Sequence, residues 1–206
     1  MPTQDSWQAL AAEPLRFVAP GAVGACLDAA LAEVEVAELL AVPRFQSRLL
    51  ARLQEIHGLA PLSEVIADDL PELDVILLAP RDLALLPQVC GALWHALALS
   101  REIRREAVQQ LRQQLGDGVF TFAISQRDQT VATDCLLEGE RLRLAIEHDG
   151  QACVAAWLQS RVEPLRRWLA LRWPSWSGGG DPGDLASRLD CLDRAVRWLH
   201  EGRTVS

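Results

Sequence analysis

The sequence contains no lysine and no tyrosine, and its 20 basic residues are all arginine. The missing lysine excludes three kinds of site: the phosphate-binding loop of P-loop proteins, a Schiff-base lysine and the strand lysine of protein kinases. The sequence also lacks G-x-S-x-G, H-E-x-x-H and any G-x-G-x-x-G that follows a strand pattern. It therefore predicts no catalytic residue, no cofactor and no enzymatic activity.

Cysteine is sparse and dispersed, with no C-x-x-C pair. The five cysteines are Cys26, Cys90, Cys135, Cys153 and Cys191. In a chain without a secretion signal such a set predicts free, buried thiols, and the spacing excludes a zinc site. Cys90 and His95 are five residues apart on one expected helix, about 140° out of phase, so they do not form a nucleophile–base pair. His95 is expected to be a core histidine with a satisfied N–H.

Long apolar runs are absent as well. The most apolar stretch, Leu83–Leu99, is interrupted by Pro87, Gly91 and His95, and it is shorter than the roughly 20 residues that a membrane helix needs. Met1–Asp5 lacks the basic region of a signal peptide. These features predict a cytoplasmic protein without direct membrane insertion.

The net charge of −8 is unevenly distributed. Residues 1–80 hold 12 acidic residues and 4 arginines, whereas residues 81–206 hold 16 of each. Neither part has the positive balance of a nucleic-acid binder, so no nucleic-acid partner is expected. An acidic first part suits docking to a basic protein surface, although solubility alone explains it equally well.

Two charged clusters are candidate protein-binding surfaces. One is an acidic run in a connector between helices, which consists of Asp68, Asp69, Glu72 and Asp74. The other lies along one edge of an expected helix that Ser100 caps and Gly116 ends, and it consists of Arg101, Arg105 and Arg112. Arg104 falls in the apolar arc of that helix beside Ile103, so its guanidinium must reach solvent or meet a carboxylate.

Apolar residues recur at helical spacing along most of the chain, which predicts an all-α protein. The expected architecture is an irregular multi-helix bundle, a single compact domain with an N-terminal arm. The arm and two helices occupy residues 1–60, and the main helical domain occupies residues 61–206. The arm is extended over residues 1–22, and the helices run from Ala25 to Ala41 and from Arg44 to His57, with Gly58 as the stop.

Other segments are less regular. Val75–Leu78 is expected as a buried loop or a short strand, and Arg141–Glu147 fits either a strand or a helix. Residues 151–169 keep one helical phase through Pro164, which predicts a kinked helix. A last helix, Pro182–Glu201 with Asp181 as its cap, carries an apolar stripe that packs on its own domain or pairs with another chain.

Residues 78–174 hold a series of local motifs. They are an apolar helix with a central Gly91, then Ile103-Arg104-Arg105 and Leu111 of the next helix, the stop Leu115-Gly116-Asp117 with Phe122-Ala123 after it, and Leu169-Ala170-Leu171-Arg172-Trp173-Pro174. In these motifs the chain resembles the K-subunit family of the bacterial type III secretion sorting platform. The same resemblance favours a helix for Arg141–Glu147.

This resemblance implies a non-enzymatic adaptor at the cytoplasmic face of the inner membrane. Its two partners are the cytoplasmic forkhead-associated-like domain of the inner-membrane ring protein and the spoke-forming, C-ring-like protein of the sorting platform. Two alternatives remain open from the sequence. One is a helical chaperone or regulatory adaptor outside secretion, and the other is a small helical enzyme that uses Cys90 or the Asp68–Asp69 pair.

Overall fold

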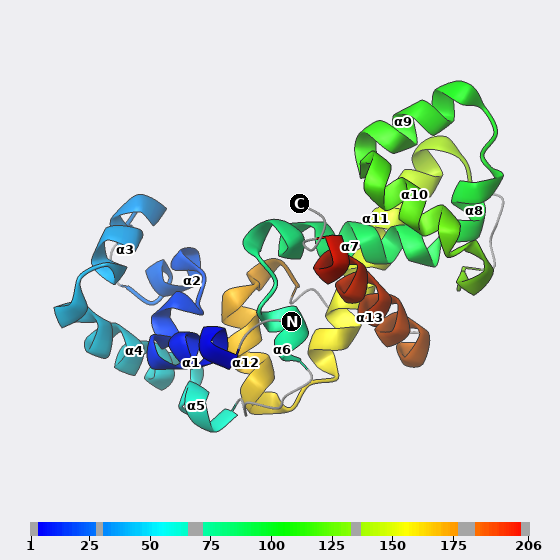
Figure 1. The fold of residues 1–206 in the computed structure, drawn as a ribbon. Helices are drawn as coiled ribbons and strands as arrows, with labels where there is room; N and C mark the ends of the chain where they lie inside the picture. Colours follow the sequence, from blue (N-terminus) through cyan, green and yellow to red (C-terminus); the bar gives the residue numbers. More distant parts are fainter. Residues whose placement is uncertain (1–3, 28–30, 66–71, 133–136, 177–183, 203–206) are drawn as a thin grey trace. The chain divides into compact units, whose positions relative to one another are not determined.

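The computed structural model describes residues 4–27, 31–65, 72–132, 137–176 and 184–202. All regular secondary structure in these residues is helical, which confirms the all-α prediction (Figure 1). The chain divides into two compact units, hereafter unit 1 (1–77 and 158–178) and unit 2 (78–157 and 179–206). The domain boundary expected between residues 60 and 61 stays a prediction.

Unit 1 begins with short helices, and prolines start the second and third of them. Its elements are α1 (Gln4–Ala12), η1 (Pro14–Arg16), α2 (Pro20–Gly24), α3 (Glu33–Leu40), α4 (Pro43–His57), α5 (Leu62–Val65), α6 (Leu73–Ile76), α12 (Glu163–Arg172) and η3 (Pro174–Trp176). The expected extended arm is wrong for the residues described, because Pro14 and Pro20 each occupy a first-turn position, where proline's fixed φ favours a helix. Phe17 is buried.

The helix expected over residues 25–41 is also wrong in its first part. The structure has α2 ending at Gly24 and α3 starting only at Glu33, where the Glu35 side chain accepts a hydrogen bond from the Ala32 N–H. The next helix, α4, is confirmed, and Gly58 ends it in the left-handed conformation with φ 58°. Residues 73–76 form the single helical turn α6, with Val75 and Ile76 buried. The expected loop or strand over Val75–Leu78 is therefore wrong for its first two residues, whereas residues 77–78 form a turn before α7, and Leu78 is buried.

The centre of unit 1 is α12, which comes from far along the chain. The Trp168 indole is fully buried, donates its Nε1–H to the Ala60 carbonyl at 2.9 Å, and meets the Phe17 ring edge-on at 6.2 Å. The Arg172 guanidinium donates to the carbonyls of Phe17 and Ile76 at 3.1 and 3.2 Å. It also lies over the Phe17 ring, 4.6 Å from its centroid. One helix therefore fixes three separate segments of the N-terminal half.

The expected kink at Pro164 is wrong. Helix α11 (Gly139–Gln159) ends, and α12 begins at Glu163 with Pro164 as its second residue. Proline lacks an N–H and clashes with the carbonyl four residues earlier, so it is tolerated in a first turn far better than inside a helix. The helical reading of Arg141–Glu147 is confirmed, because these residues lie within α11.

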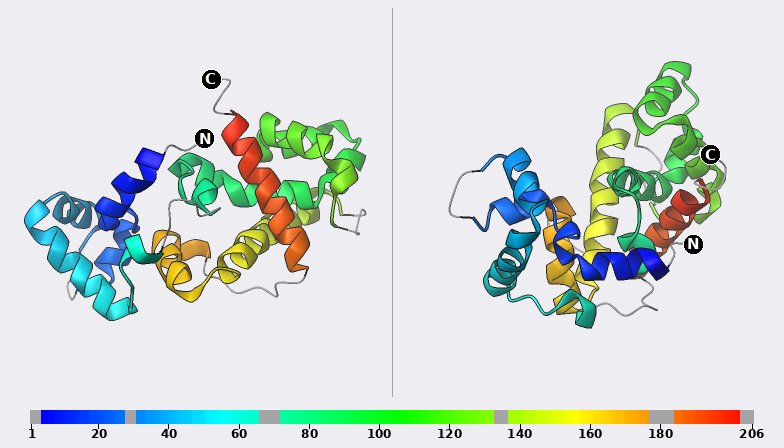
Figure 2. Two further views of the ribbon diagram at one scale, coloured as in Figure 1. Left: turned by 60° about the horizontal axis from the view of Figure 1, so that its bottom comes forward. Right: turned by 60° about the vertical axis from the view of Figure 1, so that its left-hand side comes forward.

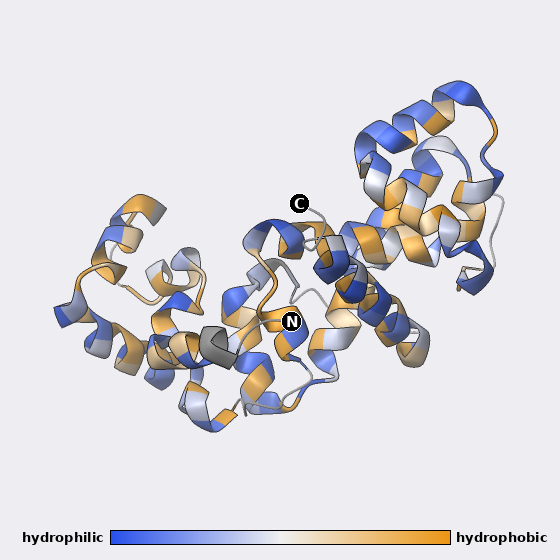
Figure 3. Cartoon of the chain, viewed as in Figure 1, coloured by the Kyte–Doolittle hydropathy of each residue, from blue (hydrophilic) through white to orange (hydrophobic). Residues whose placement is uncertain are grey.

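Unit 2 is built on helix α7. Its elements are α7 (Pro80–Trp94), α8 (Ala96–Arg101), α9 (Arg105–Leu115), α10 (Asp117–Ser125), η2 (Arg127–Gln129), most of α11, and α13 (Leu185–Glu201). Helix α13 packs across α7 (Figures 1 and 2). In Figure 3 α10 is mainly orange and white, whereas α9 carries long blue segments. Helix α10 buries Val119, Phe120 and Ala123, and α9 buries Leu111 and Leu115.

Helices α7 and α11 cross at backbone contact. A Cβ atom added to Gly91 would lie 1.9 Å from the Ile146 carbonyl oxygen, and one added to Gly150 would lie 1.9 Å from the Pro87 carbonyl oxygen. No side chain fits at either position, so the two glycines set the distance between the helices. This accounts for the central glycine of the apolar helix.

The helix expected between Ser100 and Gly116 is interrupted. Ser100 lies inside α8 and donates to the Leu97 carbonyl, and the backbone is extended at Glu102 and Arg104 before α9 begins. Ile103, expected on the apolar arc, is 88% exposed. The stop at Gly116 is confirmed, with φ 81°.

Helix α13 starts at Leu185, where the Asp184 carboxylate accepts from the Ser187 N–H as an N-cap. The expected cap, Asp181, and the expected first residue, Pro182, lie outside the described residues. The apolar stripe of this helix is largely buried within unit 2, with Leu192, Val196 and Leu199 in the core. No helix in the described part of the chain has the length and apolar character to cross a membrane.

Candidate functional site

The acidic run is only partly described, because Asp68 and Asp69 lie outside the described residues. Asp74 is exposed on α6. Glu72 is mostly buried and forms an ion pair with Arg161, which precedes α12 in the sequence by two residues. Glu72 thus contributes to the internal packing of unit 1, which leaves Asp74 as the exposed carboxylate of this cluster among the described positions.

The predicted arginine edge is divided between two helices. Arg101 is the last residue of α8, whereas Arg105 and Arg112 belong to α9. All three are exposed. The Arg112 guanidinium is 3.3 Å from the Asp117 carboxylate and lies over the Phe120 ring, 5.1 Å from its centroid. The prediction that the three arginines line one edge of a single helix is therefore wrong, although all three side chains lie on the surface.

An ion-pair clamp holds the extended segment between α8 and α9. The Arg104 guanidinium donates to both carboxylate oxygens of Glu102, at 2.9 and 2.6 Å, and is 2.9 Å from Glu138. Glu102 also accepts the Arg104 backbone N–H at 3.1 Å. These hydrogen bonds, chiefly the one from the guanidinium, lower the pKa of Glu102 to about 2. Arg104 thus meets carboxylates, as its position in the sequence requires.

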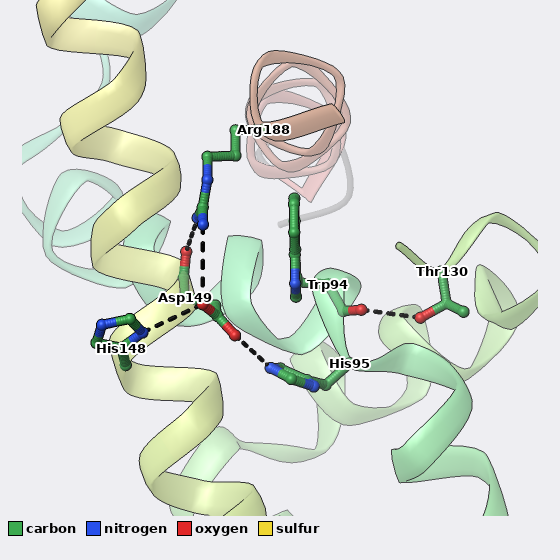
Figure 4. A network of polar contacts seen from close by, with 6 residues as sticks. All are labelled: Trp94, His95, Thr130, His148, Asp149 and Arg188. Carbon is green, nitrogen blue, oxygen red and sulfur yellow. Dashed lines mark hydrogen bonds and ion pairs between the residues drawn. The ribbon is translucent and has the colours of Figure 1, made fainter. Parts of the chain in front are cut away.

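A buried polar network ties three helices of unit 2 together (Figure 4). At its centre the Asp149 carboxylate of α11 lies 2.8 Å from His95 Nε2 and 3.2 Å from His148 Nδ1. Arg188 of α13 donates to the Asp149 carbonyl at 3.4 Å and stacks over the Trp94 ring at 4.7 Å. His95 is 3% exposed, so the prediction of a core histidine with a satisfied N–H is confirmed.

The protonation of this network follows from its contacts. Burial favours the neutral acid at Asp149, but the hydrogen bonds from His95 and His148 outweigh it and lower the pKa of the carboxyl. An ionised Asp149 only accepts, so Nε2 of His95 carries the proton that is donated. His95 Nδ1 is buried and finds no hydrogen-bond partner within the residues described.

His95 also lies at a break in the expected long apolar helix, and neighbouring residues bind the backbone groups beside this break. His95 separates α7 from α8, and its backbone leaves helical geometry at φ −103° and ψ 22°. Thr130 donates its hydroxyl to the Trp94 carbonyl at 2.8 Å and accepts the Leu97 N–H at 3.3 Å. The Ala132 N–H reaches the same Trp94 carbonyl at 3.1 Å. The partly buried backbone groups beside the break therefore have hydrogen-bond partners.

The described cysteines are free and buried, as the sequence predicts, while Cys135 lies outside the described residues. Burial raises the pKa of the Cys90 thiol, and a hydrogen bond to Cys191 together with burial raises that of Cys153. Thiols of raised pKa are poor nucleophiles. Among the described residues no group of three or more metal-ligating side chains converges on a metal site.

No family model and no solved structure matches the chain. It is 33% identical over 103 residues to the nodulation protein NolU of Rhizobium fredii, and equally to NolU of Sinorhizobium fredii strain NBRC 101917 / NGR234. The chain is homologous to NolU over half its length. The match covers 50% of this chain and 47% of each relative. The chain therefore spans about half the length of the relatives that it matches.

Sequence reasoning missed the partners of His95. Asp149 and Arg188 lie 54 and 93 positions further along the chain, and no local pattern connects them. One signal was available: a charged residue directly before Gly150, in a helix that must pack closely, needs a buried partner. The pairing itself is set by the α7–α11 crossing, which only the structure reveals.

Proposed function

We propose that this chain is a non-enzymatic adaptor of a type III secretion sorting platform at the cytoplasmic face of the inner membrane. It joins the cytoplasmic forkhead-associated-like domain of the ring protein to the spoke-forming, C-ring-like protein. It acts by binding alone and takes no cofactor. Two exposed surfaces hold the two assemblies in register.

The observation that carries this proposal concerns the residues that resemble the K-subunit family. Gly91 permits the α7–α11 contact, Gly116 ends α9 with a positive φ, and Leu111 and Ala123 are buried in unit 2. These residues build a framework, which is what distant members of one adaptor family must share. Homology to a nodulation protein is a second support, because that name describes a bacterial process and not a metabolic reaction.

The buried ionisable groups of unit 2 support a binding role over an enzymatic one. His95 and Arg188 both bind Asp149 and so tie helices together. Exposed charges suitable for docking lie elsewhere, at Arg105 and Arg112 on α9. Such an interface does not have to be large or hydrophobic, because charges at its rim steer association and fix the register of the two proteins.

The test is reconstitution from three purified proteins. The chain is mixed with the ring protein's cytoplasmic domain and with the spoke protein, and the mixture is resolved by size-exclusion chromatography. The expected result is one complex that contains all three, together with each binary complex that includes this chain. A chain that binds neither protein overturns the proposal and favours a chaperone or regulatory adaptor outside secretion.

A charge-reversal pair assigns the surface. The double variant R105E/R112E is expected to weaken binding to one partner by about tenfold or more, which corresponds to about 1.4 kcal/mol. The matched control is R197E, since Arg197 is an exposed arginine of α13 on the same unit. Equal loss in R197E and R105E/R112E contradicts a docking role for the α9 arginines.

A further inference from the structure

Two adjoining hollows run along the exposed side of α7. The first, of about 480 Å³, lies between α7, the end of α9 and the middle of α11, and its apolar lining includes Pro87 and Ile146. The second, of about 470 Å³, lies between the start of α7, the start of α10 and the end of α13, and its apolar lining includes Leu85 and Trp198. Each has the volume of a typical ligand site.

The hollows form one groove because they share lining residues. Ala84 and Leu115 line both. Ala84 is exposed, and its small side chain leaves the passage between the two open. The stacked pair of Trp198 and Phe122, with ring centroids 5.0 Å apart, fixes one wall of the second hollow.

The charges along the groove are unequally balanced. In the first hollow, Arg143 is already paired with Glu140 at 2.7 Å and with Glu147 at 3.1 Å. In the second, Arg81 is exposed and forms no ion pair or hydrogen bond with any other described residue. An open cation beside an apolar hollow is complementary to a carboxylate that sits next to an apolar anchor.

We infer that this groove binds an acidic amphipathic helix of a partner protein, with one apolar anchor in each hollow and a carboxylate on Arg81. A helix places side chains three or four residues apart on the same face, so one helix supplies two anchors to adjoining hollows. This inference deepens the proposed function. The biological role of the groove rests on that proposed function, whereas the binding chemistry of the groove does not.

The probe is a panel of fluorescein-labelled 18-residue helical peptides. Each carries two leucine anchors four residues apart, with a glutamate one turn before the anchors in one peptide and one turn after them in another. A third peptide replaces the glutamate by glutamine, and a fourth has proline between the anchors. Binding to the full chain is measured by fluorescence polarisation.

At least one glutamate peptide is expected to bind more tightly than about 1 mM, with the glutamine peptide about tenfold weaker. A84W, which places an indole where the two hollows meet, and R81E are each expected to weaken binding at least tenfold. The matched control is A51W, because Ala51 is an exposed helical alanine of α4 outside the groove. Circular dichroism of each variant confirms that the helices are retained.

Three results overturn the inference: no glutamate peptide binds, A84W binds as well as the wild type, or the proline peptide binds as well as its helical parent. The last result assigns the groove to an extended segment instead. If the chain binds neither secretion protein but A84W abolishes peptide binding, the proposed function fails and the groove stands. If both secretion proteins bind and A84W alters neither them nor the peptide, the groove fails and the proposed function stands.

Discussion

Replacing Gly91 by alanine tests the backbone contact between α7 and α11. The new methyl group would lie 1.9 Å from the Ile146 carbonyl oxygen and 3.1 Å from a methyl carbon of the same residue. A rotamer change cannot relieve contact with a backbone atom, so the helices must move apart. Overpacking costs about 1–3 kcal/mol and sometimes more, and contact with the backbone belongs at the upper end of that range.

Alanine also gains stability in a helix, which offsets part of the cost. The gain over glycine is about 0.5–1 kcal/mol. The net loss expected for G91A is therefore about 2 kcal/mol or more, which lowers Tm by roughly 4–8 °C in a chain of this size. The measurement is urea unfolding, followed by circular dichroism and tryptophan fluorescence, with the midpoint and slope compared to wild type.

The matched control is the same substitution at Gly118 of α10. A Cβ atom there meets only the Trp198 ring at 3.6 Å, an ordinary contact. G118A is therefore expected to raise stability by up to about 1 kcal/mol. The test is that G91A lowers the free energy of unfolding whereas G118A raises it. A G91A protein as stable as wild type would refute the reasoning that the glycine sets the helix separation.

Three further predictions address the remaining core. D149N is expected to lower the free energy of unfolding by about 1–3 kcal/mol and to make stability less dependent on pH in the acid range. The folded pKa of Asp149 is lowered, so its contribution to stability is complete above the unfolded pKa and is lost as pH falls through the folded pKa. Urea midpoints from pH 6 to pH 2 measure this loss. R172A leaves the carbonyls of Phe17 and Ile76 without their donor and is expected to cost about 2–4 kcal/mol, and equal stability by thermal unfolding would contradict that role. In a C135S background the other thiols are expected to react with an aromatic disulfide reagent only after unfolding, because all of them are buried, and rapid reaction of the native protein would contradict this.

Local signals predicted several features correctly. Gly58 ends α4, and Gly116 ends α9. These residues act on their own backbone, so their effect is visible in the sequence. The all-α class followed from apolar periodicity in the same way, since each helix turns its own stripe toward the core.

The sequence pattern failed at two helix breaks. Residues 102–104 keep the apolar spacing of a helix, but the Glu102 carboxylate takes the Arg104 backbone N–H and holds the chain extended. The apolar phase also continues through Pro164, although the backbone there ends one helix and begins another. Periodicity reports which residues face the core and does not report whether the backbone between them is continuous.

The candidate binding surfaces were predictable only in part. Exposure of Arg105 and Arg112 agrees with their polar spacing on α9. The groove was not predictable, because residues from five helices line it and Ala84 and Trp198 are 114 positions apart in the sequence. A site assembled from distant helix ends has no contiguous signature.

Because α12 lies after α11 in the sequence but belongs to the first unit, neither unit is complete until late in synthesis. When only residues 1–77 of a nascent chain have left the ribosome, Trp168 and Arg172 are still missing. These two side chains are the hydrogen-bond donors to the carbonyls of residues 17, 60 and 76. The second unit in turn waits for α13. Residues 1–77 therefore cannot complete their packing until most of the polypeptide has been translated.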